Sequence, residues 1–199
     1  MYLRPDLAII ADWIKPQSRV LDLGCGDGTL LDYLQQSKAV TGYGLEIQPH
    51  AIQRCIERGV NVIQTDLDAG LSEFEADSFD YVIMSQSLQA LNYPDRIVQD
   101  MVRVGRQGIV SFPNMGHWRC RLQLMFKGQM PQTESLPHEW YNTPNIHLCT
   151  IVDFKQFCRQ HALQITQTQL IDHHLRSKRL VRWWPNLLTE TALFRFQIS

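Results

Sequence analysis

The residues most suited to chemistry form the motif D-x-G-x-G-x-G, which occupies positions 22–28. Glycine has no Cβ, so its backbone can adopt positive φ and approach a bound molecule closely. A helical pattern begins at Thr29, and the first N–H groups of such a helix have no partner inside it and can face a ligand. The motif therefore predicts a site for a nucleotide-like molecule. Its candidate binding residues are Asp22, Gly24, Cys25, Gly26 and Gly28.

The spacing of the glycines distinguishes between two nucleotide-like ligands. A dinucleotide fingerprint reads G-x-G-x-x-G, which from Gly24 would place a third glycine at position 29, where Thr29 stands. The motif instead resembles motif I of the class I S-adenosylmethionine (SAM)-dependent methyltransferases. In that arrangement Asp22 would lie near the charged amino-acid moiety of the cofactor, where a carboxylate attracts an ammonium group. An ordinary strand-to-helix turn is the alternative.

Strands and helices alternate around this motif, and their order predicts the fold class. The repetition up to residue 112 predicts an α/β, doubly wound, mostly parallel sheet of the Rossmann-like methyltransferase type. Residues 163–171 and 192–198 alternate in polarity, which predicts a C-terminal antiparallel hairpin and a seven-stranded sheet in one domain, 1–199. The other expected strands are 19–23, 39–47, 60–64, 79–85 and 108–112, and the expected helices are 5–14, 29–36, 48–58, 94–104, 119–126 and 150–161.

Polar and apolar residues at the ends of the later strands extend the predicted site. Glu46 lies 24 positions after Asp22 (46 − 22), close to the offset of about 20 at which a second-strand acid meets ribose hydroxyls. In the resembled superfamily, the acid at the end of the third strand bonds the adenine amine and its neighbour packs on the ring. Asp66 and Leu67 match this pattern. The further cofactor candidates are Glu46, Ile47, Asp66, Leu67, Ser85 and Gln86.

The segment 113–149 departs from the alternation and is rich in proline, aromatic residues and histidine. Such a long segment is usually functional, so we interpret it as a lid or partner-binding insertion. His117 and His147 are candidate bases, because imidazole titrates near neutral pH. The alternative is that such residues hold an irregular loop through ordinary contacts. The candidates for substrate or partner binding are Asn114, Glu139, Trp140 and Tyr141.

Composition limits the function classes. The 199 residues are 44% hydrophobic and 20% charged with a net charge of −1, which gives no reason to expect nucleic-acid binding. Five scattered cysteines without a C-x-x-C pair predict reduced thiols and a cytoplasmic location, and no apolar run is long enough to predict a membrane span. No metal is expected, because His147 and Cys149 lack further ligands at zinc spacing. Residues 176–185 combine basic residues with two tryptophans, which suits either RNA or partner contact or a solvated connection.

Four further stretches, at residues 85–89, 111–118, 137–141 and 144–150, together resemble the MetW family of methionine biosynthesis proteins. The resemblance covers nearly the whole chain and implies a partner, a homoserine O-acyltransferase. We rank a SAM-binding accessory or regulatory subunit of that enzyme first. A catalytic SAM-dependent methyltransferase of a small-molecule acceptor comes second, because the sequence supplies no identifiable acceptor or base. A nicotinamide-dependent oxidoreductase comes third, disfavoured by Thr29.

Overall fold

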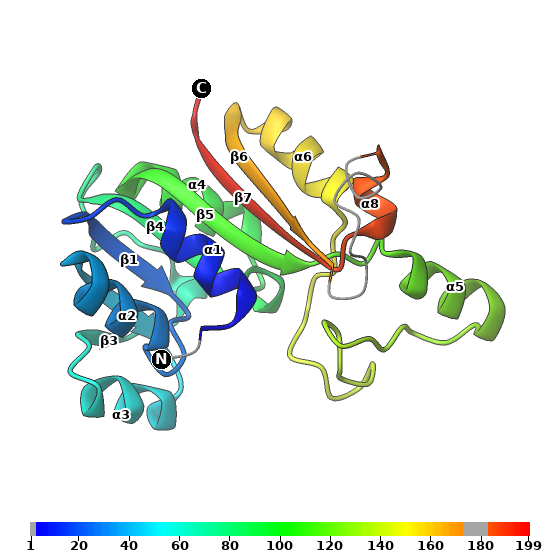
Figure 1. The fold of residues 1–199 in the computed structure, drawn as a ribbon, viewed down its shortest axis with the longest axis horizontal. Coiled ribbons are helices and arrows are strands. Elements are labelled where there is room, and N and C mark those ends of the chain that lie inside the picture. The colour runs from blue at the N-terminus through cyan, green and yellow to red at the C-terminus, as the bar shows by residue number, and fades with distance from the viewer. Residues whose placement is uncertain (1–2, 173–182) are drawn as a thin grey trace.

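Seven strands form a single mixed sheet in the computed structural model, which describes residues 3–172 and 183–199. The strand order is β3-β2-β1-β4-β5-β7-β6, in which the first five neighbours are parallel and β7 runs antiparallel to both β5 and β6 (Figure 1). This confirms the predicted doubly wound sheet with its C-terminal antiparallel hairpin. The strands are β1 Arg19–Leu23, β2 Thr41–Glu46, β3 Val62–Gln64, β4 Phe79–Ser85, β5 Gly105–Pro113, β6 Leu163–Ile171 and β7 Thr191–Ile198.

Helices cover both faces of the sheet, and alternate residues of β4 divide between the two layers. Tyr81 and Ile83 pack with residues of α1, α2 and α3, whereas Val82 and Met84 pack with residues of α4 and α6. Because both faces are covered, the central strands are apolar almost throughout. The helices are α1 Pro5–Trp13, α2 Thr29–Lys38, α3 Pro49–Glu57, α4 Pro94–Val104, α5 Trp118–Lys127, α6 Ile151–Gln160 and α8 Pro185–Leu188.

Local sequence signals explain where these helices begin and end. Four of them start at a proline, whose fixed φ suits the first helical position. The predicted capping box of α6 is present, because the Thr150 and Asp153 side chains each accept a hydrogen bond from the other residue's backbone N–H. Gly59 follows α3 with a φ of +75°, the left-handed conformation that commonly ends helices.

Element boundaries differ from the sequence prediction where pairing or a turn decides them. α2 continues to Lys38, and Ala39 ends it with a φ of +52°, so β2 begins only at Thr41. β5 is longer than predicted, because Gly105 already pairs with β4 and Pro113 still pairs with β7. Both neighbours therefore extend a strand whose apolar run alone indicated a shorter one.

The segment between β5 and α6 leaves the sheet and carries α5 away from the body of the molecule (Figure 1). The chain after α5 folds back on it, since the Gln123 side chain makes two hydrogen bonds with the backbone of Gln132. The segment then returns to the sheet, where the N–H groups of Ile146 and His147 donate to the carbonyl of Gln89. None of the helices in the described ranges is long and apolar enough to cross a lipid bilayer.

Candidate functional site

The predicted cofactor residues gather where β1 to β4 end, at one edge of the sheet. The order in which the chain adds strands reverses between β1 and β4. β2 and β3 lie on one side of β1, whereas β4 and then β5 lie on the other. In open α/β sheets, ligands bind outside the carboxyl ends of the strands at such a switch point. We call this region the switch edge. It carries Asp22 and the glycine-rich turn, Glu46, Asp66, Ser85 and Gln86.

The glycine-rich turn has the backbone that its sequence demands. Gly24, Gly26 and Gly28 have φ values of +69°, +58° and +75°, which disfavour residues with a Cβ. The carbonyl of Leu45 in β2 accepts hydrogen bonds from the N–H groups of Gly24 and Cys25, and so fixes the start of the turn. A Cβ on Gly26 would meet no protein atom within 4 Å, so this glycine presents an open backbone surface to the edge.

Glu46 braces the same turn from the end of β2. Its Oε2 accepts from the N–H of Gly26 at 2.9 Å, and its Oε1 accepts from the N–H groups of Ile47 and Gln48 at 2.9 and 3.0 Å. A carboxylate offers about four lone-pair positions, so three bonds leave room for one more. Two ribose hydroxyls would therefore bind here only if one backbone bond, such as that of Gly26, were released.

Asp22 is a buried acid at the end of β1 with only 3% of its surface exposed. Burial raises its pKa to about 7, opposed by the positive charge of Arg4 and reinforced by the negative charge of Glu46. The carboxyl group is therefore poised to ionise when a cation arrives. An ammonium group placed beside it would supply the counter-charge that the buried site favours.

The thiols of Cys25 and Cys55 lie beneath the turn, with their Sγ atoms 3.8 Å apart. The Cys55 thiol donates to the carbonyl of Gly26 at 3.2 Å, which ties α3 to the glycine-rich turn. Burial raises the pKa of both thiols, so they remain protonated near neutral pH. In the described chain all five cysteines are free, as predicted.

Residues predicted to hold an adenosine differ in exposure. Ile47 is 53% exposed and offers an apolar side chain next to Glu46, whereas Leu67 is 9% exposed and belongs to the core. The Asp66 side chain accepts from the N–H of Asp68 at 3.0 Å and so stabilises a turn. Ile47 is thus better placed than Leu67 to pack against a ring, and both assignments stay predictions.

A buried carboxylate that the sequence did not single out lies at the end of β4. Asp6 of α1 is 4% exposed, and its Oδ2 accepts hydrogen bonds from Ser85 at 3.1 Å and from the Gln86 side chain at 3.2 Å. Arg4 pairs with Asp6 at 3.0 Å and also donates to Ser85. Gln86 has a φ of +55°, a strained conformation for a non-glycine residue that often marks a functional position. The first helix therefore contributes charged groups to the switch edge, which no local motif announced.

A cavity of about 370 Å³ opens beside this network. Its walls come from α1, the end of β4, the segment after α5 and the two C-terminal strands, so it joins the switch edge to the predicted lid. Charged and polar groups line it together with a few apolar ones. The lining residues are Arg4, Pro5, Asp6, Gln86, Glu134, Ser135, Pro137, Ile171 and Thr191.

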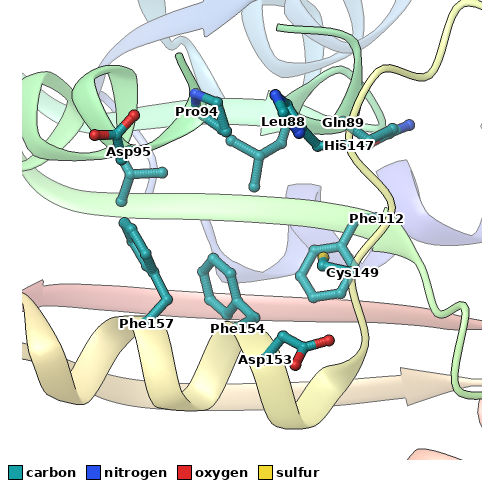
Figure 2. A pocket seen from close by; sticks show the side chains of 11 residues that line it. Leu88, Gln89, Pro94, Asp95, Phe112, His147, Cys149, Asp153, Phe154 and Phe157 are labelled. Atoms are coloured by element: carbon teal, nitrogen blue, oxygen red, sulfur yellow. The ribbon is translucent and has the colours of Figure 1, made fainter. Parts of the chain in front are cut away.

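A second cavity, of about 240 Å³, lies between α4, β5 and α6 (Figure 2). Phe112, Phe154 and Phe157 are part of its wall, and the ring centroids of Phe112 and Phe154 are 5.2 Å apart. His147 reaches it from the returning segment, where its Nε2 lies 3.3 Å from the carbonyl of Asn92. This candidate base therefore faces an apolar cavity, with its ring held at the rim.

The other predicted residues of segment 113–149 divide between the interior and the surface. Asn114 is 1% exposed, and its amide group donates to the carbonyls of Asn186 and Thr189. Its side-chain oxygen accepts from the N–H groups of Gly116 and Ile151, so all four positions are used inside the chain. Asn114 therefore joins the start of segment 113–149 to the chain before α6 and β7, and its role in substrate binding stays a prediction.

His117 is likewise buried, at 2% exposure. Burial lowers the pKa of its imidazole, an effect opposed by the nearby Glu190 and Asp172 carboxylates. Trp140 and Tyr141 are in contrast 75% and 67% exposed, with their rings 5.7 Å apart. A hydrogen bond to the Glu139 carboxylate raises the pKa of the Tyr141 hydroxyl. The basic residues predicted for RNA or partner contact lie at 176–182, outside the described residues.

Comparison with known sequences gives a family match over most of the chain. The family model described as methionine biosynthesis protein MetW matches residues 4–196. A bifunctional methionine biosynthesis protein MetXA/MetW from Rhodopirellula baltica is 32% identical over 203 residues, which cover 98% of this chain and 33% of that protein. A ribosomal protein L11 methyltransferase from Methylobacillus flagellatus is 28% identical, over 68% of this chain and 42% of its own length. The chain thus spans less than half the length of these relatives.

Two solved structures with the same fold are described as SAM-dependent methyltransferases. One from Archaeoglobus fulgidus superposes with a TM-score of 0.70 at 15% identity and covers 96% of this chain and 90% of its own. Another, from Mesorhizobium loti, has a TM-score of 0.69 at 16% identity and covers 96% and 95%. Such low identities establish the shared fold and leave the activity to be argued from the site.

Proposed function

The chain belongs to the methionine biosynthesis protein MetW family, and from this premise we propose that it is a SAM-binding accessory or regulatory subunit of a homoserine O-acyltransferase in the cytoplasm. The observation that carries the proposal is the relative from Rhodopirellula baltica, which bears both the MetXA and the MetW name in one chain. Parts that are fused in one organism often work as separate, associating chains in another. The chain matches one third of that protein, so a separate partner would supply the rest.

The switch edge supports SAM as the ligand. Asp22 provides a buried acid for an ammonium group, Glu46 provides acceptor capacity for a ribose hydroxyl, and Ile47 provides exposed apolar surface for a ring. The positive charge of Arg4 opposes the rise in the pKa of Asp22, and we assign Arg4 to the carboxylate of the same amino-acid moiety. These groups match an amino acid joined to a nucleoside, with opposite charges at one end and a flat ring at the other.

An exposed apolar surface supports a protein partner. On α5, Leu122, Met125 and Phe126 are 39%, 67% and 76% exposed and recur at helical spacing, so they share one side of the helix. We call these three residues together with Trp140 and Tyr141 the α5–lid surface. Large aromatic and methionine side chains at such exposure are typical of interface anchors. The acyltransferase is the partner that we assign to it.

Two measurements on wild-type protein test this function. The chain co-expressed with a homoserine O-acyltransferase from the same organism is expected to co-elute with it in size-exclusion chromatography at micromolar concentration. Calorimetric titration is expected to show binding of SAM and of S-adenosylhomocysteine to the chain alone. Separate elution would contradict the subunit role, and binding of SAM only in the presence of the partner would relocate the cofactor site.

A catalytic methyltransferase is the second candidate, favoured by the polar cavity of about 370 Å³ beside Gln86. That cavity has room for a small acceptor next to the switch edge. His117 and His147 are the candidate bases, and neither lines this cavity, so the acting histidine would have to reach the acceptor from outside it. Replacement of that histidine by Gln would abolish methyl transfer while leaving SAM affinity nearly intact. Absence of transfer from radiolabelled SAM to a cell-extract acceptor pool would remove this candidate. Loss of SAM affinity in either variant would make that histidine a structural group.

A further inference from the structure

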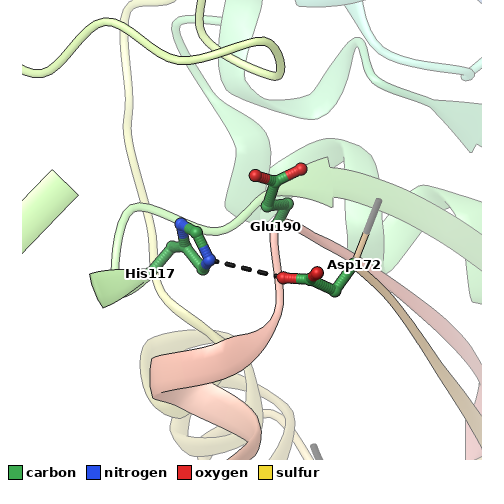
Figure 3. Close-up of side chains that lie close together, drawn as sticks. All are labelled: His117, Asp172 and Glu190. Carbon is green, nitrogen blue, oxygen red and sulfur yellow. Dashed lines mark ion pairs between the residues drawn. The ribbon is translucent and has the colours of Figure 1, made fainter. Parts of the chain in front are cut away.

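Three potential metal ligands from distant parts of the chain meet behind the predicted lid (Figure 3). His117 precedes α5, Asp172 follows β6 and Glu190 precedes β7. Each offers one ligand atom, and these atoms all lie within 4.8 Å of one another. The side chains of His117, Asp172 and Glu190 are 2%, 2% and 0% exposed. Burial on this scale is unusual for two carboxylates unless a counter-charge accompanies them.

The distances fit a small ion more closely than an ordinary hydrogen bond. The Nε2 atom of His117 lies 3.4 Å from Oδ2 of Asp172. Two ligands bound at zinc distances of roughly 2.0–2.1 Å in a tetrahedral arrangement are about 3.4 Å apart. This pair therefore already has the separation of two zinc ligands. The Glu190 ligand atom lies within 4.8 Å of the other two and would need to move closer to complete a third bond.

The imidazole of His117 gives a second, independent indication of a ligand. Neither of its ring nitrogens makes a hydrogen bond with any of the described residues, although the ring is almost wholly buried. Figure 3 shows the ring turned toward Asp172. A buried ring nitrogen without a hydrogen bond is costly, because it has lost its contact with water. A bound cation would use it as a ligand.

Arg119 lies at the edge of this cluster. Its Nη1 is 3.7 Å from Oε1 of Glu190. The Arg119 side chain is 34% exposed, whereas the side chains of the three cluster residues are buried.

We propose that His117, Asp172 and Glu190 bind a divalent transition-metal ion of the Zn²⁺ class. One imidazole with two carboxylates suits such ions, whereas Mg²⁺ prefers an all-oxygen set. Backbone hydrogen bonds already hold the three positions together: Asn114 donates to the carbonyl of Glu190, and the N–H of Glu190 donates to the carbonyl of Ile171. The metal would therefore join the base of α5 to the two C-terminal strands as a structural clamp.

The test uses the full chain after dialysis against a chelator. Titration with ZnCl₂ is expected to show one tight equivalent and a raised melting temperature, with no effect of equimolar MgCl₂. With Co²⁺ as the probe, the visible absorption of a low-symmetry, nitrogen- and oxygen-ligated ion is expected. Asp172→Asn and Glu190→Gln should each weaken Zn²⁺ affinity at least tenfold. The absence of a tight equivalent in the wild-type protein would overturn the proposal, even if the variants failed to fold.

Two control variants exclude other zinc sites in the chain. His147→Ala removes the histidine nearest Cys149, and a double change of His173 and His174 to Ala removes the histidines that follow Asp172 in the sequence. Zn²⁺ affinity is expected to remain within about twofold of wild type in both. Loss of the tight equivalent in either control, with retention in Glu190→Gln, would place the metal elsewhere and overturn the assignment.

Discussion

At the switch edge, buried acids and backbone N–H groups satisfy one another, whereas on the α5–lid surface large apolar side chains reach into solvent. Glu46 alone accepts three backbone hydrogen bonds, while Phe126 and Trp140 are about three quarters exposed. The first region is preorganised for a small polar molecule, because its groups are already oriented. The second gains its stabilisation only when another surface covers it. The difference suggests that the two regions bind different kinds of ligand and can be disrupted separately.

The largest expected effect comes from Gly26→Val at the switch edge. Valine is strained at a φ of +58°, and its side chain would occupy the open surface where the backbone approaches the ligand. We expect SAM affinity to fall by about a hundredfold, or roughly 2.7 kcal/mol, in calorimetry. Association with the acyltransferase should persist.

Gly59→Val is the matched control for this change. Gly59 has a φ of +75°, and a Cβ there would also meet no protein atom within 4 Å, but it ends α3 and is not part of the glycine-rich turn. It imposes similar backbone strain without blocking the proposed ligand. Equal losses of SAM affinity in both variants would show that strain alone is responsible and would remove the argument for close approach.

Trp140→Ala should produce the reverse pattern. Removing this 75% exposed ring is expected to weaken the acyltransferase complex by about 2 kcal/mol, or about thirtyfold, the loss typical of an interface anchor. SAM affinity should not change. Trp184→Ala, at a 61% exposed tryptophan before α8, is the control, and binding can be measured by surface plasmon resonance. A loss confined to Trp184→Ala would move the interface to the C-terminal side of the chain.

Glu46→Ala is expected to lower SAM affinity at least about tenfold. It removes the acceptor for a ribose hydroxyl, and a hydrogen bond to a charged group contributes about 1.5–3 kcal/mol. The same change removes three bonds that hold the turn, so the melting temperature should fall as well. Glu57→Ala, at an acid on α3 that bonds only Gln53 among the described side chains, should change neither quantity. Unchanged affinity in folded Glu46→Ala protein would contradict the ribose assignment.

The smallest expected effect is a dependence of SAM affinity on pH. The pKa of Asp22 is raised to about 7, so the carboxylate that would pair with the ammonium group is mostly protonated at pH 6. Affinity should therefore rise about eightfold between pH 6.0 and 7.5. Asp22→Asn should abolish this rise, and calorimetry in two buffers should detect a proton released on binding to the wild-type protein.

The same raised pKa also sets a sign for stability. An acid whose pKa rises from 3.8 in the unfolded chain to about 7 in the fold binds more protons when folded. The free energy of unfolding therefore decreases as the pH rises from about 3.8 to about 7, because the folded chain must give up this proton or keep it at increasing cost. Asp22→Asn should flatten this part of the pH profile in chemical denaturation. A profile identical to that of the wild-type protein would contradict the raised pKa.

Local sequence was enough to predict that the candidate cofactor residues lie at one edge of the sheet, because a glycine-rich turn and a strand-end acid are encoded within a few residues. The extent of β5 was harder to predict, since both of its neighbours extend it through pairing. Asp6 was missed because its partners Ser85 and Gln86 lie far along the chain and only folding joins them. The cluster around His117 was missed for the same reason, and no spacing in the sequence signals it.

The paired thiols beneath the glycine-rich turn make the motion of this turn measurable. Alkylation requires the thiolate, and burial keeps the pKa of both Cys25 and Cys55 high, so iodoacetamide should react with them mainly when the turn opens. The alkylation rate of each cysteine, followed over time by mass spectrometry of its peptide, would then report how often the turn opens. A ligand that closes the turn would lower the alkylation rates of Cys25 and Cys55 and leave that of Cys158 on α6 unchanged.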